Sequence, residues 1–133
     1  MELTLDRPGD HHYVRSVSAD GIRVADRLYP GPLVISADRL LDDWSVHSLA
    51  ELSEATLQPV FELEPEIVLV GTGAVQRFLP PELMMCFFSR HIGVEVMTTD
   101  AACRTFNVLA TEQRKVVAAL LPPATEDQDP VRA

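Results

Sequence analysis

Long apolar runs are absent from this 133-residue chain, and none approaches the roughly 20 residues that a membrane-spanning helix needs. The opening segment, MELTLDRPGD, lacks the apolar stretch of a secretory signal and the arginine-rich, acid-poor composition of a transit peptide. We therefore expect no transmembrane segment and a cytoplasmic location.

Basic residues and cysteines are also scarce. The chain has 11 lysines and arginines against 20 aspartates and glutamates, a formal net charge of -9, which repels nucleic acid and anionic membrane surfaces. We expect no nucleic-acid partner. Cys86 and Cys103 lie in apolar, helix-forming surroundings, and a lone structural disulfide is uncommon in a cytosolic domain. Both are interpreted as small buried hydrophobic residues.

Patterns typical of catalysis and metal binding are missing as well. His11 and His12 are adjacent and would point to opposite faces of a strand, while His47 and His91 are isolated. The sequence contains no Cys-x-x-Cys, His-x-x-x-His or Gly-x-Ser-x-Gly pattern. The prediction is a protein with no catalytic residues, no metal and no cofactor.

Hydrophobic residues make up 47% of the chain, enough for the core of one domain. The N-terminal part alternates apolar and polar residues, which indicates half-buried strands over Tyr13–Ser18, Ile22–Leu28 and Leu33–Ser36. Asp20-Gly21 and Pro30-Gly31 are strong turn signals between them. These strands are expected to form an antiparallel meander.

The middle of the chain is harder to assign. Leu40–Trp44 is ambiguous, and Trp44–His47 has the pattern of a short strand. Ser48-x-x-Glu51 has the form of a capping box that opens a helix. Pro59 is expected to interrupt or end that helix.

The second half alternates strands and helices. Its predicted elements are a buried strand at Ile67–Val70, a helix at Glu82–Ile92 ended by Gly93, a strand at Val94–Met97, a helix capped by Thr99, and a closing strand at Lys115–Leu121. The Glu82–Ile92 helix is apolar nearly all round, which predicts burial on most sides. The expected fold is α/β: the meander plus a β-α-β-α-β unit, in a mixed sheet with helices packed in layers. One domain is predicted over residues 1–121, with a disordered acidic tail at 122–133.

Gly71-Thr72-Gly73 follows a buried strand, as phosphate-binding loops do. A dinucleotide fingerprint needs a third glycine where Gln76 stands, and a P-loop needs a Gly-Lys-Ser/Thr that is absent. The next helix also starts late, near Pro81, so its N–H groups would not point at this loop. We interpret the loop as a tight turn packed against another element, with a binding loop for an anion or polar ligand as the alternative.

Polar residues near the loop favour the alternative. Arg77 lies close by, Asp100 follows the next strand, and Arg104 and Asn107 lie in the following helix. Asn107 is unfavourable in a helix, so it either makes a structural hydrogen bond or faces a cleft. The candidate ligand cleft comprises Gly71, Thr72, Gly73, Arg77, Asp100, Arg104 and Asn107, at the edge where strands end and helices begin.

Two stretches together point to a family. VLVGTG, then an apolar helix, then GVEVMTTDAACRTFNVLATEQRKVVAALLP resembles a small single-domain family of uncharacterised bacterial and archaeal proteins and the mitochondrial complex I (NADH:ubiquinone oxidoreductase) assembly factor 3. The matching positions are Gly71-Thr72-Gly73, Gly93, Met97, Thr99, Ala101, Asn107, Leu109 and Arg114-x-Val116. Two departures are visible. Glu112-Gln113-Arg114 replaces a usual Glu-Gly-Arg, and Phe106 replaces a common tyrosine.

The resemblance implies an α/β domain without an established activity, metal or cofactor. It also implies an unknown protein partner, as for an assembly factor in respiratory complex biogenesis. The hypothesis is therefore a non-catalytic protein that acts by protein–protein interaction, as a monomer or weak homo-oligomer. The rival hypothesis is a small-ligand- or anion-binding domain, or an enzyme, that uses the Gly71-Thr72-Gly73 loop.

Overall fold

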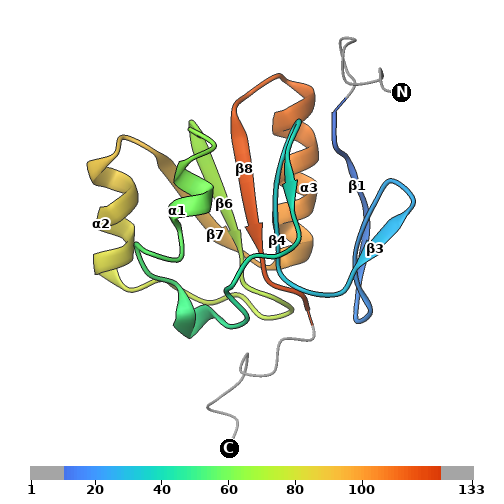
Figure 1. Cartoon of the computed structure of the whole chain (residues 1–133), viewed down its shortest axis with the longest axis horizontal. Coiled ribbons are helices and arrows are strands. Elements are labelled where there is room, and N and C mark those ends of the chain that lie inside the picture. Colours follow the sequence, from blue (N-terminus) through green and yellow to red (C-terminus); the bar gives the residue numbers. More distant parts are fainter. Residues whose placement is uncertain (1–10, 124–133) are drawn as a thin grey trace, which may run out of the picture.

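A five-stranded sheet in the order β5-β4-β8-β6-β7 forms the centre of the protein (Figure 1). This computed structural model describes residues 11–123. The strands are β4 (Leu33–Ser36), β5 (Leu40–Leu41), β6 (Ile67–Gly71), β7 (Gly93–Met97) and β8 (Val116–Leu120). Strand β6 runs parallel to β7 and β8, while β4 is antiparallel to β8 and β5. The predicted mixed sheet is confirmed, and β6 and β8 are its buried inner strands.

A second, three-stranded sheet is built from the N-terminal part. Strands β1 (Val14–Ser18), β2 (Gly21–Val24) and β3 (Arg27–Tyr29) pair antiparallel in that order. The prediction of a single strand over 22–28 was wrong, because the chain reverses at Ala25, which has a positive φ of 53°. Leu33–Ser36 is a strand as predicted, but it pairs with β8 in the larger sheet and not with the meander.

The two faces of the larger sheet carry different layers (Figure 1). On one face lie the 3₁₀-helix η2 (Leu49–Glu51), α1 (Gln58–Phe61) and α2 (Pro81–Ser89). Helix α3 (Thr99–Thr111) and the β1–β3 sheet cover the other face. Residues of β6 alternate between the two cores, with Val68 and Val70 on the α2 side and Leu69 on the α3 side. The layered α/β architecture is therefore as the sequence predicts.

The segment before β6 departs from prediction. The Ser48 side chain makes no capping bond, and Glu51 instead accepts a hydrogen bond from the His47 amide at 2.7 Å. The outcome is one 3₁₀ turn. Pro59 lies in the first turn of α1 and does not end a helix, since a proline there loses no internal hydrogen bond. The Trp44–His47 stretch is irregular and not a strand. The Trp44 indole N–H donates to the Thr56 carbonyl at 2.9 Å.

Both longer helices end in a Schellman motif without glycine. After α2 the Ile92 amide donates to the Phe87 carbonyl, and His91 takes the left-handed conformation with φ of 60°. Gly93, predicted to end this helix, instead begins β7. After α3 the same geometry falls on Gln113, with φ of 63°.

The start of α3 and the surface of α2 also differ from expectation. Thr98, not Thr99, caps α3, because its side chain accepts a hydrogen bond from the Ala101 amide. The prediction that α2 is buried on most sides was wrong. Its buried residues are Leu83 and Phe87, which face the sheet, while its outer side is exposed.

The proposed division into one domain and a tail is a prediction that remains open. The tail lies outside the described residues from position 124 onward.

Candidate functional site

The Gly71-Thr72-Gly73 loop joins the carboxyl ends of the three parallel strands. The Thr72 amide donates to the Met97 carbonyl at 2.8 Å, and the Leu121 amide donates to the Gly71 carbonyl at 3.0 Å. The Thr72 hydroxyl donates to the Val75 carbonyl at 2.7 Å, which closes the turn. These bonds tie β6 to the ends of β7 and β8.

Thr99 completes this junction from the start of α3. Its side chain is fully buried, accepts a hydrogen bond from the Gly73 amide at 2.8 Å and donates to the Leu121 carbonyl. The Thr99 amide in turn donates to the Gly73 carbonyl at 2.9 Å. Sequence reasoning assigned Thr99 a capping role and missed this one, because its partners are distant in the chain.

Gly71 has a steric reason to lack a side chain. A Cβ there would lie 2.9 Å from both the Thr99 hydroxyl oxygen and a Leu120 methyl group. Gly73 has a positive φ of 96°, which favours glycine. Both glycines are therefore accounted for by a packed turn.

The remaining residues of the predicted cleft lie in different settings. Asp100 and Arg104 form an exposed ion pair one turn apart on α3. Asn107 bonds the amide and the carbonyl of Val14, each at 2.9 Å, and so attaches β1 to α3. Arg77 is half-buried, and its Nε is buried without a hydrogen-bond partner. A shared ligand cleft of all seven residues stays a prediction.

The described residues include a buried cysteine, Cys103, and no cluster of side chains suited to a metal ion. Burial raises the pKa of the Cys103 thiol to about 12, with a further rise from the nearby Asp100 carboxylate. A thiol held neutral in this way is a poor nucleophile. Within residues 11–123, no group of three or more His, Cys, Asp or Glu side chains is arranged to hold a metal ion.

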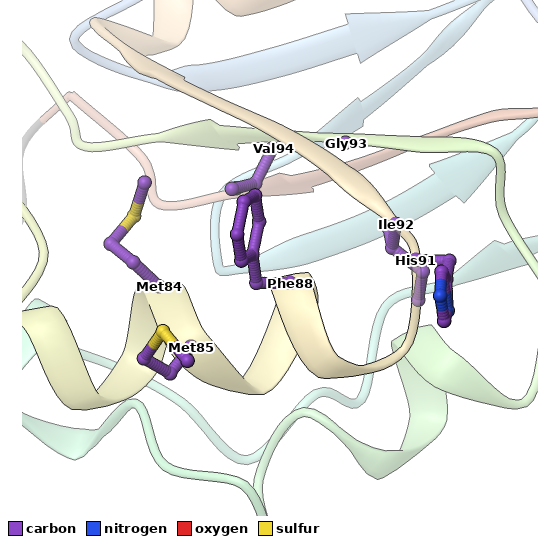
Figure 2. A pocket seen from close by; sticks show the side chains of 7 residues that line it. All are labelled: Met84, Met85, Phe88, His91, Ile92, Gly93 and Val94. Atoms are coloured by element: carbon purple, nitrogen blue, oxygen red, sulfur yellow. The ribbon is translucent and has the colours of Figure 1, made fainter.

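An apolar groove lies between α2 and β7 (Figure 2). Its cavity of about 680 Å³ is lined by Met84, Met85, Phe88, His91, Ile92, Gly93 and Val94. The Phe88 side chain is 75% exposed and lies beside Val94 (Figure 2), and Met85 is 57% exposed. The sequence signal for this groove was present in the all-round apolar character of α2, but burial was the wrong interpretation of it.

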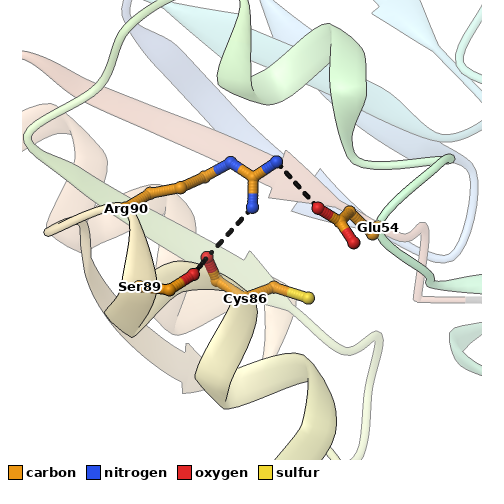
Figure 3. A network of polar contacts seen from close by, with 4 residues as sticks. All are labelled: Glu54, Cys86, Ser89 and Arg90. Atoms are coloured by element: carbon orange, nitrogen blue, oxygen red, sulfur yellow. Dashed lines mark hydrogen bonds and ion pairs between the residues drawn. The ribbon is translucent and has the colours of Figure 1, made fainter.

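Polar contacts fix the helix that forms this groove. Arg90, at the end of α2, donates to a Glu54 carboxylate oxygen at 2.9 Å and to the Cys86 carbonyl at 3.3 Å (Figure 3). Its guanidinium also lies over the Phe61 ring, 4.2 Å from the centroid. The α2 helix is therefore held against the α1 segment as well as against the sheet.

The described helices include none long and apolar enough to cross a membrane. Among known proteins, the chain is 37% identical over 116 residues to mouse NADH dehydrogenase [ubiquinone] 1 alpha subcomplex assembly factor 3, covering 86% of this chain and 62% of that protein. It thus spans about three fifths of that relative's length. It is also 32% identical over 89 residues to the 13 kDa major membrane protein of Francisella tularensis, covering 66% of this chain and 72% of that one.

Solved structures of two bacterial proteins have the same fold. The NMR structure of a Xanthomonas campestris protein matches with a TM-score of 0.81 and 32% identity, over 95% of this chain and 96% of that one. A Bordetella parapertussis crystal structure matches with a TM-score of 0.78 and 34% identity, over 84% and 96%. Residues 14–121 match the model of one family, described as a protein of unknown function (DUF498/DUF598). The resemblance seen in the sequence is thereby confirmed, and the chain belongs to the DUF498/DUF598 family.

Proposed function

We propose that this protein acts without catalysis, by binding another protein through the exposed apolar side of α2. The observation that carries the proposal is the exposure of large apolar side chains there. Phe88, Met85 and Met84 on α2 are exposed by 75%, 57% and 37%, and all three line the groove. Clustered exposed apolar side chains are typical of protein-interaction sites.

The relatives support an assembly-factor-like role. Several carry the name complex I assembly factor 3 at about 35% identity, and an assembly factor acts through contacts with the proteins it helps to assemble. The corresponding role for this chain would be in the biogenesis of a respiratory complex. The Gly71-Thr72-Gly73 loop fits this picture as the joint that holds β6, β7 and α3 rigid beneath the surface.

Copurification tests the proposal. The untagged protein, expressed at its native level, should be recovered with a partner in stoichiometric amount. Repeated recovery of the free chain from cells that express all candidate partners would contradict the proposal.

A second candidate function is binding of a small anion beside the Gly71-Thr72-Gly73 loop. It is favoured by the buried Arg77 Nε, which has no hydrogen-bond partner and would gain one from an anion. A panel of nucleotides, phosphates and acyl metabolites should then raise the melting temperature. A ligand at 100 times its dissociation constant adds about 2.7 kcal/mol of stability. An unchanged melting temperature across the panel, or equal stabilisation of wild type and Arg77→Met, would remove this candidate.

A further inference from the structure

We infer that β7 accepts an additional strand from the partner, and that this strand alternates apolar and basic side chains. The inference rests on the proposed function and specifies its partner. Three features carry it: the free edge of β7, the apolar groove beside that edge, and the exposed carboxylate of Glu95 on its other face.

Strand β7 is at the edge of the sheet, because β6 is its one neighbour among the described strands. The Gly93 amide donates to the Glu66 carbonyl, and the Met97 carbonyl accepts from the Thr72 amide, so these two residues direct their backbone groups toward β6. In a parallel ladder the alternate residues direct theirs the other way. Val94 and Val96 therefore present N–H and C=O groups along the outer edge.

A side chain already reaches this edge. The Gln76 amide donates to the Val96 carbonyl at 3.4 Å. This long contact shows that the Val96 carbonyl is directed outward and accessible to a donor. A backbone amide of an added strand would make a shorter bond in the same place.

The two faces of the added strand would meet different surroundings. Val94 and Val96 face the α2 layer, so side chains beside them would enter the groove with Met84, Met85 and Phe88. Methionine side chains adapt to varied apolar shapes, which suits such a groove. Glu95 is exposed and points to the opposite face of the sheet. A lysine or arginine on that face would lie across from its carboxylate.

Charge also distinguishes this partner from a second copy of the chain. Antiparallel pairing of two β7 strands centred on Glu95 would place the two Glu95 carboxylates opposite each other, which is destabilising. Each copy also carries a net charge of -9, which opposes self-association. A basic, apolar strand from another protein has neither disadvantage.

The test uses the full chain and two fluorescent peptides of equal length, one alternating valine with lysine and the other valine with glutamate. Fluorescence anisotropy should show the valine-lysine peptide binding at least about tenfold more tightly than the valine-glutamate peptide, equivalent to about 1.4 kcal/mol. On binding, hydrogen exchange of the Val94 amide should slow. Equal affinities, or no slowing at Val94, would overturn the inference.

Variants separate the two faces. Glu95→Lys should reduce the preference for the valine-lysine peptide, whereas Phe88→Glu should weaken binding of that peptide about tenfold or more. Both positions are exposed, so both variants should fold. Val94→Pro removes the outward amide and should abolish binding, with Val94→Ala as its control. Unchanged binding by Glu95→Lys or Phe88→Glu would refute the assignment of the faces.

Other occupants give distinct results. A concentration-dependent dimer in sedimentation, lost in Phe88→Glu, would assign the groove to a second copy and overturn the inference. Flotation with neutral phosphatidylcholine vesicles, without peptide binding, would overturn it in favour of a lipid surface. If a native partner is lost with Phe88→Glu but copurifies equally with wild type and with Val94→Pro, the inference fails while the proposed function stands. If no partner copurifies with wild type, the proposed function itself fails.

Discussion

Two residues at the ends of α2 and α3, His91 and Gln113, adopt a backbone conformation that usually belongs to glycine. Both have positive φ at the position after the helix cap, where a side chain is crowded by the carbonyl that follows. At Gln113 the family resemblance itself points to glycine. The structure thus gives the physical reason why glycine is usual at the position where this chain has Gln113.

Gln113→Gly should raise the free energy of unfolding by about 0.5–1 kcal/mol, because relief of the left-handed strain exceeds the larger conformational entropy of glycine in the unfolded chain. Gln113→Ala is the matched control, since it keeps the Cβ and should give no gain. Urea denaturation of the three proteins measures the effect. A glycine variant no more stable than the alanine variant would show that the position is unstrained.

Thr99 is expected to be the most sensitive residue of the glycine junction. Thr99→Val keeps the shape but leaves the Gly73 amide and the Leu121 carbonyl without their partner, which should cost about 2–3 kcal/mol. Thr99→Ser keeps the hydroxyl and should cost much less. Thermal or urea unfolding of both variants checks the difference, and a Thr99→Val variant as stable as the wild type would contradict the role assigned to the hydroxyl.

Cys103 should resist thiol reagents in the folded protein. Its pKa is raised, so the neutral thiol is favoured in the folded state. The neutral Cys103 thiol contributes fully to the stability of the folded protein below the pKa of the unfolded thiol, near 9. This contribution is lost as the pH rises toward the folded-state pKa of about 12. In the Cys86→Ser variant, thiol labelling at pH 8 should be slow and should become fast in denaturant. Rapid labelling of the native variant would contradict the assigned burial.

At the scale of elements, the attachment of α2 rests on Arg90 as well as on apolar packing. Arg90→Ala removes the bonds to Glu54 and Cys86 and the contact with the Phe61 ring, for an expected loss of about 1–2 kcal/mol. Glu54→Gln affects only the partly exposed ion pair and should cost less than about 1 kcal/mol. The double variant should show coupling in a double-mutant cycle. Strict additivity would mean that the pair does not interact in solution.

Elements were predictable where one local rule governed them. Apolar runs and alternation located four strands of the larger sheet, β4, β6, β7 and β8, and β6 was recognised as buried from Ile67–Val70 alone. Strand β5 lies in the stretch that was ambiguous in the sequence. Prediction failed where a turn lacked its usual residue and where a proline began a helix. Ala25 divides β2 from β3 without a glycine, and Pro59 opens a helix that it was expected to end.

The candidate site was only partly accessible to the same reasoning. The Asp100–Arg104 pair follows from helical spacing, but the bonds of Asn107 to Val14 join positions 93 residues apart. Apolar residues on α2 were correctly located and wrongly assigned to the core, because the hydrophobic pattern of a helix does not distinguish a core face from a face for a partner. Their exposure could be recognised only from the structure, in which α2 lies over the edge of the sheet.

At the scale of the whole molecule, an α/β body presents an apolar groove beside β7, an edge strand of the described sheet. The strongly negative net charge sets the sign of the partner it would attract, and added salt should therefore weaken binding of a basic partner. In the proposed function α2 provides the contact with the partner, and the hydrogen bonds of the glycine junction hold together the strands behind it.

The most direct test compares copurification from the native host of the wild-type chain and of Phe88→Glu, with Val108→Glu as the control. Val108 is an exposed apolar residue on α3, away from the groove, with 55% of its surface accessible. We predict a stoichiometric partner with the wild type and with Val108→Glu, and its loss with Phe88→Glu. A partner retained by Phe88→Glu, or absent from the wild type, would contradict the claim that this protein works through the exposed face of α2.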